Sequence, residues 1–71
     1  MSDVVRADLV GNVLQVLVVP GATVAAGEPV VLLESMKMEI PVSSEVGGLV
    51  SDVPVAVGDV VQEGDVLVVL S

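Results

Sequence analysis

With 71 residues, no cysteine and no histidine, the chain is long enough for one small domain but lacks the side chains that most hydrolytic, redox and metal sites use. Its formal net charge of −8 excludes nucleic acid and anionic membrane surfaces as partners, because proteins bind both mainly through Lys and Arg. No apolar run approaches the roughly 20 residues of a spanning helix, and the start, MSDVVRAD, resembles no export signal. We therefore expect a cytoplasmic protein.

Valine dominates the chain, filling 21 of its 71 positions. Its branched side chain packs well on a pleated sheet and is restricted in a helix. No window shows a period of 3.6 residues, whereas short apolar runs recur between Gly and Pro. These patterns predict an all-β fold with strands near residues 3–8, 12–19, 23–24, 30–35, 38–42, 46–53, 60–61 and 65–70, of which 23–24 and 60–61 are very short.

The chain also repeats itself. A shift of 37 residues places 11–34 on 48–71 with nine identities in 24 positions and no gap, including three glycines in register. Two copies of one unit, each too small to bury its apolar face alone, are expected to pack about an approximate two-fold axis. We therefore expect a single domain over residues 1–71.

Each copy places a valine between two glycines that are six residues apart. Glycine permits the positive φ angles that turn a strand sharply, and the valine between can point inward. Neither copy shows the order of strand, glycine-rich loop and helix that binds phosphate, so we assign these glycines to the fold alone. The residues are Gly21, Val24 and Gly27 in the first copy and Gly58, Val61 and Gly64 in the second.

Between the copies lies LLESMKMEIPV, residues 32–42, which contains the only lysine of the chain. A hairpin with Met36 and Lys37 as its two turn residues places apolar pairs on one face and charges on the other, as strand alternation requires. A shift of one residue would bury a glutamate. The predicted pairs are Leu33 with Ile40, Val31 with Val42 and Glu34 with Glu39. The first two pairs are expected to be buried, and Glu34, Met36, Lys37, Met38 and Glu39 exposed.

Two features of this hairpin are locally unfavourable. Two-residue turns prefer Asn-Gly, because both residues need positive φ, yet here the pair is Met36 and Lys37. Glu34 and Glu39 also place like charges directly opposite each other. Because local rules are often broken at functional sites, the hairpin is predicted to present its tip to another molecule.

The sequence around Lys37, taken without any family resemblance, allows two interpretations of this lysine. A lone lysine is usually a solvated surface charge, or an edge-strand charge that discourages aggregation. The absence of any other lysine, however, leaves one side-chain amine that a modifying enzyme could select. Met36 and Met38 are either gap-fillers or adaptable side chains suited to another protein's groove. The residues alone leave both interpretations open.

The stretch ESMKMEIPV, Glu34 to Val42, resembles the attachment motif of biotinyl domains, and the repeated V..G..V..G units resemble the two halves of the biotinyl/lipoyl fold. That resemblance implies a flattened β-barrel of two four-stranded antiparallel sheets with quasi two-fold symmetry, the hammerhead fold. It covers essentially the whole chain. It is greatest to stand-alone biotin/lipoyl attachment proteins and to the carrier domains of biotin-dependent carboxylases.

The resemblance also implies a function. Lys37 would be the biotin acceptor, Met36 and Met38 the flanking recognition residues, and Glu34 and Glu39 an aid to recognition by a biotin protein ligase. The biotin would carry carboxylate between a biotin carboxylase and a carboxyltransferase on separate subunits, and the protein would be a monomeric, non-catalytic carrier. Lipoyl domains usually have Asp-Lys-Ala at the tip, so the two methionines favour biotin.

Three alternatives remain at this stage. The chain could be a lipoyl or dual-specificity carrier, or a hammerhead interaction module that is never modified. An enzyme with Glu34 and Glu39 as an acid/base pair is disfavoured, because two carboxylates on a hairpin surface lack the burial that separates the pKa values of a catalytic pair.

Overall fold

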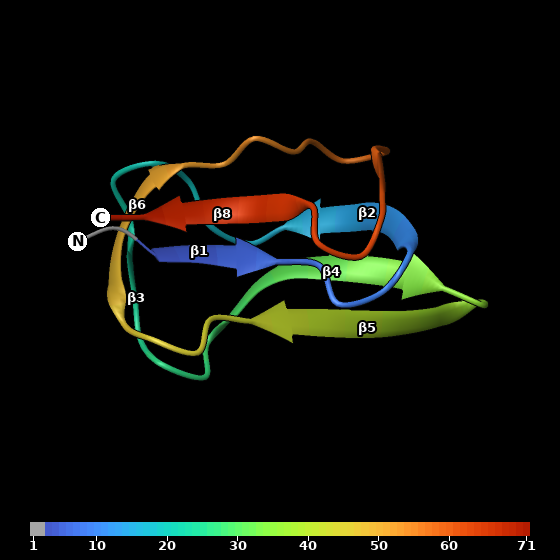
Figure 1. Ribbon diagram of the computed structural model, residues 1–71, viewed down its shortest axis with the longest axis horizontal. Helices are drawn as coiled ribbons and strands as arrows, with labels where there is room; N and C mark the ends of the chain where they lie inside the picture. The colour runs from blue at the N-terminus through green and yellow to red at the C-terminus, as the bar shows by residue number, and fades with distance from the viewer. Residues whose placement is uncertain (1–2) are drawn as a thin grey trace.

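The computed structural model describes residues 3–71, so the first two residues of the expected domain lie outside the described part. All eight predicted strands are present, and within these residues no helix forms, which confirms the all-β prediction (Figure 1). Nothing in residues 3–71 is therefore a helix that could span a membrane. The strands are β1 (Asp3–Arg6), β2 (Gly11–Val16), β3 (Thr23–Val24), β4 (Pro29–Ser35), β5 (Met38–Ser43), β6 (Gly48–Asp52), β7 (Val60–Val61) and β8 (Val66–Leu70).

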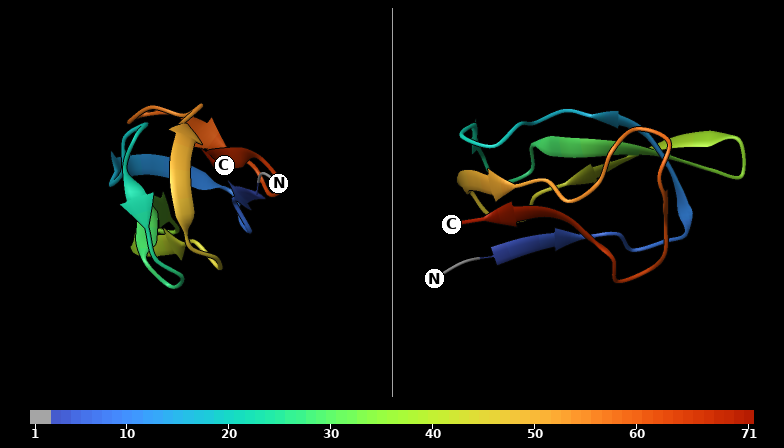
Figure 2. Two further views of the ribbon diagram at one scale, coloured as in Figure 1. Left: turned by 90° about the vertical axis from the view of Figure 1, so that its left-hand side faces the viewer. Right: turned by 90° about the horizontal axis from the view of Figure 1, so that it is seen from above.

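The strands form two antiparallel sheets of four, as predicted. One has the order β1-β8-β6-β3 and the other β5-β4-β2-β7. Exchanging β1 with β5, β2 with β6, β3 with β7 and β4 with β8 converts one order into the other. Each sheet therefore contains strands from both halves of the chain. The left view of Figure 2, along the long axis, shows the sheets wrapped around each other, and the right view shows the start of β1 and the end of β8 at one extremity and the β4–β5 hairpin at the other. The expected quasi two-fold symmetry is therefore present.

Main-chain hydrogen bonds join the two halves reciprocally. Val13 and Val50 are equivalent residues of β2 and β6, each 1% exposed, and each exchanges two bonds with the turn of the other half. Gly21 and Gly58 lie in these turns with φ angles of 94° and 96°, which a side chain would strain. Gly21 donates to Val50, which donates to Ala22, while Gly58 donates to Val13, which donates to Asp59, all at 2.8 Å.

The predicted C-terminal ends of the first two strands were wrong, because strand pairing stops earlier than the apolar pattern. The predicted strand 12–19 ends at Val16, because Leu17 makes the last bond to β4, donating to the Val30 carbonyl at 2.9 Å, before the chain crosses to the other sheet. The predicted strand 3–8 ends at Arg6, after a register shift against β8. Both departures depend on partners distant in sequence.

A third predicted strand, 46–53, was also too long, and β6 begins only at Gly48. Ser44, 1% exposed, closes the preceding turn: its hydroxyl donates to the Val46 carbonyl at 2.5 Å and accepts from the Val46 amide at 3.4 Å. Local side-chain bonds of this kind compete with strand pairing. Residues 46–47, which the sequence pattern placed in the strand, therefore belong to the turn.

The core between the sheets consists only of valine, leucine and alanine side chains. Val24 and Val61, the valines predicted to point inward between paired glycines, are 3% and 2% exposed. Among residues 3–71, no buried side-chain polar atom lacks a hydrogen-bond partner. The buried cluster is Val5, Ala7, Val13, Val18, Val24, Val30, Val31, Leu33, Val42, Val50, Val61, Leu67, Val68 and Leu70.

Gly11 allows β2 to approach the root of the hairpin. A Cβ atom at Gly11 would lie 2.8 Å from the main-chain oxygen of Glu34 in β4, closer than real Cβ contacts. At the equivalent Gly48, the nearest atom would be the Ser71 oxygen at 3.5 Å, an ordinary contact. The two equivalent glycines therefore differ in their tolerance of a side chain.

We expect Gly11→Ala to lower the free energy of unfolding by about 1–3 kcal/mol, the usual cost of overpacking. Gly48→Ala is the matched control and should be neutral or stabilising by up to about 1 kcal/mol, because glycine is unfavourable inside a strand. Urea unfolding followed by circular dichroism measures both, since the chain has no aromatic residue for fluorescence. Equal effects at the two positions would contradict the contact assigned to Gly11.

Candidate functional site

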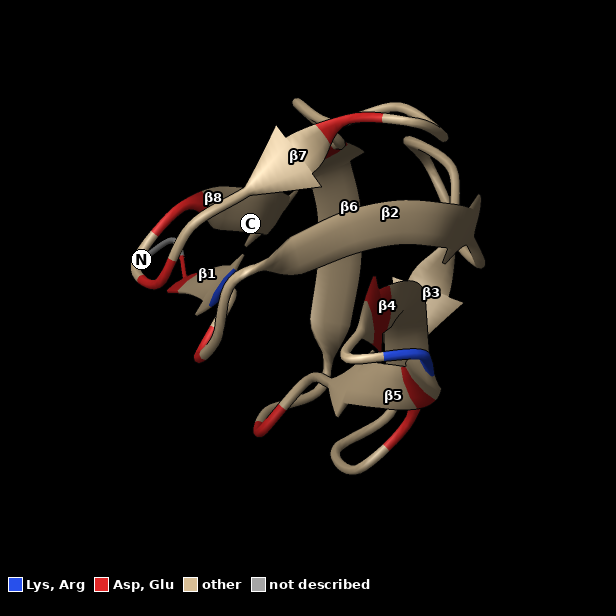
Figure 3. Cartoon of the chain, turned by 90° about the vertical axis from the view of Figure 1, so that its right-hand side faces the viewer, with Lys and Arg blue, Asp and Glu red and all other residues tan. Residues whose placement is uncertain are grey.

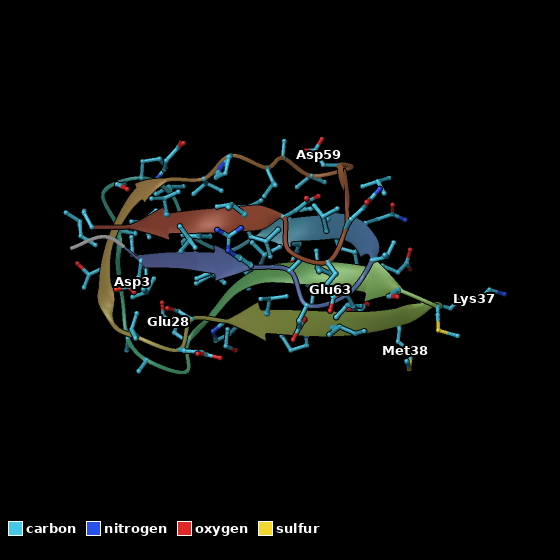
Figure 4. The ribbon with its side chains drawn as sticks, viewed as in Figure 1. Asp3, Glu28, Lys37, Met38, Asp59 and Glu63 are labelled. Carbon is cyan, nitrogen blue, oxygen red and sulfur yellow. The ribbon has the colours of Figure 1, made fainter. Side chains whose placement is uncertain are left out.

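The β4–β5 hairpin turns through Met36 and Lys37, as predicted from the sequence. Ser35 pairs with Met38 across the turn, and the two turn residues have φ angles of 53° and 64°. Among the described residues other than glycine, only these two have positive φ. The Lys37 side chain extends from the end of the molecule and points away from it (Figure 4).

The pairing register below the turn is also as predicted. Leu33 lies opposite Ile40, Val31 opposite Val42 and Glu34 opposite Glu39. Val31 and Leu33 are fully buried and Val42 is 8% exposed. The apolar face of the hairpin therefore fastens it to the core, while the turn and the charged face remain outside.

Two burial predictions were wrong. Ile40 was expected in the core but is half-buried: β5 is an edge strand of its sheet, and Ile40 lies closer to the exposed turn than Val42, which is 8% exposed. Glu34 was expected to be exposed but is half-buried. It lies in the middle of its sheet, with Glu39 opposite on one side and Asn12 on the other. Of the two paired glutamates at the hairpin root, Glu34 is therefore half-buried and Glu39 is exposed.

The tip itself is open and its flanking side chains are apolar. Met36 is 88% exposed and Met38 is 58% exposed, and Lys37 is also exposed, all as predicted. Contact with another molecule would remove these apolar side chains from water, which is favourable.

Lys37 is the only lysine of the chain, and acidic residues lie beside it (Figure 3). Figure 3, viewed from the hairpin end, shows a blue segment at the β4–β5 turn with red segments on the adjoining strand residues. The only other cation of the chain besides the terminus, Arg6, donates a hydrogen bond to the Gly64 carbonyl at 2.8 Å in another part of the fold. A protein that selects one amine on this domain therefore meets one lysine side chain, beside Glu34 and Glu39.

A groove of about 490 Å³ lies between the free edges of β1 and β5, but none of the hairpin residues discussed above as site candidates lines it. Its lining includes Val5, Arg6, Val42 and Ser44. No cluster of residues in the described part of the chain could hold a metal ion. The chemistry that the hairpin offers is therefore that of one exposed amine, which fits a prosthetic group joined through its carboxyl by an amide bond.

Sequence reasoning missed the supporting role of Gly11 and Asn12 at the hairpin root. Asn12 lies opposite Glu34, and Gly11 provides the close approach of β2 to it. The repeat aligned Gly11 with Gly48, but it could not show that only Gly11 is closely approached. It could not show which backbone atom approached there, because that atom belongs to a residue 23 positions later.

Comparison with known proteins identifies the family. The family described as "Biotin-requiring enzyme", the biotin/lipoyl family, matches residues 2–70. The chain belongs to this family. Over 71 residues it is 54% identical to the biotinylated protein TB7.3 homolog of Mycobacterium leprae, and each chain is covered completely. It is 45% identical over 67 residues to the biotin/lipoyl attachment protein of Bacillus subtilis, covering 94% of this chain and 92% of that one.

A solved structure shows the same fold within a much larger protein. The urea carboxylase of Kluyveromyces lactis contains a region that superposes with a TM-score of 0.93 at 27% identity. The match covers all of this chain and 6% of that one. The resemblance read from residues 34–42 and from the repeat is therefore confirmed at the level of family and fold.

The left-handed turn generates a prediction for the biotin/lipoyl hairpin. Met36→Asn should raise the free energy of unfolding by about 1 kcal/mol, because asparagine tolerates positive φ better than methionine. For a domain of this size that gain corresponds to roughly 4–8 °C in Tm. Met38→Asn is the control, since Met38 lies in β5 and asparagine is unfavourable in strands. A rise of the same size in both variants would contradict strain at the turn.

Proposed function

We propose that the chain is a biotin carrier whose single attachment site is Lys37. The observation that carries the proposal is the position of this one lysine, at a two-residue turn with exposed methionines on both sides. The family of the chain and the biotinylated relative of equal length support it. The protein positions biotin and has no catalytic role of its own.

Attachment requires a second protein. Lysine amines in general are protonated at pH 7 and are poor nucleophiles until an enzyme removes the proton. The carboxyl group of biotin must also be activated before it can form an amide. None of the hairpin side chains named above is a histidine or another good base at that pH. We therefore assign the activation to a biotin protein ligase.

Recognition by the ligase would use both faces of the tip. Met36 and Met38 offer flexible apolar side chains that can enter a groove, and their exposure means that contact removes apolar surface from water. Glu34 and Glu39 add negative charge beside the acceptor, which favours a basic surface on the ligase. Lys37 forms the amide.

We propose biotin-dependent carboxylation as the setting. A structural neighbour is a carboxylase that contains this fold within its own chain. The biotin on Lys37 would carry carboxylate between a biotin carboxylase and a carboxyltransferase. Both enzymes would be separate subunits that the carrier visits in turn, and we expect the carrier itself to be monomeric and cytoplasmic.

A second candidate is lipoate on the same lysine. The Bacillus subtilis relative, 45% identical, is named for both groups. Lipoate also forms an amide with a lysine amine, so Lys37 fits either acid. The mass of the adduct distinguishes the two.

The proposal is tested by intact mass. After production with abundant biotin and biotin protein ligase, the protein should gain one biotinyl group, and Lys37→Arg should gain none. Arginine keeps the charge and most of the length, so the fold should be unchanged by circular dichroism. Absence of the adduct, or an adduct that survives in Lys37→Arg, would refute the assignment, and a lipoyl mass would select the second candidate.

Glu39→Gln should change stability and recognition in opposite directions. Removal of one of two like charges paired across strands should stabilise the domain by about 0.2–1 kcal/mol, and less at high salt. The rate of biotinylation should fall severalfold, because the ligase loses a charge beside the acceptor. Glu28→Gln is the control: it makes the same charge change at an exposed turn residue at the other end of the molecule (Figure 4). The same rate loss in Glu28→Gln would mean that net charge alone is recognised.

A further inference from the structure

The oxidisable side chains of this chain are concentrated at the attachment hairpin. The sequence has no cysteine, tryptophan, tyrosine or histidine, the other residues that oxidants commonly attack. It has three methionines, and Met36 and Met38 flank Lys37 directly. An oxidant that meets the described part of the protein therefore finds its reactive sulfur atoms beside the proposed acceptor.

The two thioethers are accessible and lie outside the core. Met36 is 88% exposed and Met38 is 58% exposed, so a peroxide reaches either sulfur without any opening of the fold. The buried cluster contains only valine, leucine and alanine. Oxidation of methionine in a core commonly disrupts packing, but here it changes only the surface of the tip. The domain can therefore be oxidised and remain folded.

We propose that Met36 and Met38 form an oxidation switch that controls the loading of Lys37. In the forward step the thioether sulfur attacks one oxygen of a hydroperoxide, the O–O bond breaks, and the sulfoxide forms with release of water or an alcohol. The sulfur loses two electrons and the peroxide gains them. In the reverse step a methionine sulfoxide reductase takes two electrons from a dithiol, which becomes a disulfide, and the oxygen leaves as water.

The switch would act through the contact that the proposed function requires. A groove that accepts two apolar thioethers must, after oxidation, remove water from two strongly polar S–O groups that find no partner there. This cost opposes the docking that precedes transfer of biotin, and we expect the rate of transfer to fall at least about tenfold.

The experiment compares the rate of biotinylation before and after treatment with hydrogen peroxide. Peptide mapping by mass spectrometry should locate one added oxygen on Met36 and one on Met38. Circular dichroism should show that the treated protein unfolds at the same temperature as the untreated protein. Treatment with the two methionine sulfoxide reductases, one for each sulfoxide epimer, should restore the original rate.

The matched control is the double variant Met36→Leu, Met38→Leu, in which Met1 is the only remaining methionine. Each protein is compared with its own untreated rate, so any effect of leucine on that rate cancels. Peroxide should leave the ratio for this variant at one. A similar loss in the variant would place the effect elsewhere and overturn the proposal, as would a fully oxidised wild type that loads at the untreated rate.

The inference rests on the proposed function, and the same experiment separates the two. If untreated protein accepts no biotin, the proposed function fails and the switch fails with it. If untreated protein accepts biotin and oxidised protein accepts it equally well, only the switch fails. Failure of peroxide to oxidise Met36 and Met38 in the folded protein would also overturn it.

Discussion

The fold depends on main-chain hydrogen bonds that each half of the chain receives from the other. The amide and carbonyl of Val13 are paired with the second half, and those of Val50 with the first, so neither half satisfies its buried backbone alone. The glycines at 21 and 58 supply the left-handed angles that bring the donors into place. The two sheets therefore form together around a single apolar core.

This reciprocal frame explains where the irregular features of the protein lie. In the 37-residue repeat, Glu34 aligns with Ser71 and Ile40 aligns with Asp3. Residues 35–39, between these positions, therefore have no counterpart among the described residues of the other half. The strained turn and the exposed methionines all fall within these five residues. A carrier benefits from such a separation, since a tip that contributes little to the fold is free to fit its partners.

Much of this architecture follows from local sequence, and the exceptions have one common cause. The strands and the register of the hairpin could be predicted because valine runs, glycines and charged residues alternate at short range. The end of β2, the half-burial of Ile40 and the approach at Gly11 could not, because each depends on an acceptor, a sheet edge or a carbonyl distant in sequence. Biotin as the ligand came from the family, since an exposed lysine alone does not specify which acid it binds.

The opposite placement of the hairpin and the chain ends has a mechanical consequence. β1 and β8 pair with Asp3 opposite Leu70, so the start of β1 and the end of β8 lie together, at the end of the 33 Å body that is opposite the turn (Figure 1). Between that end and the turn lie the hydrogen-bonded strands of the two sheets. The folded domain therefore acts as a spacer: a surface or protein joined at that end would be held away from the amine by the length of the domain, and the prosthetic arm and the joining segment would add to the reach.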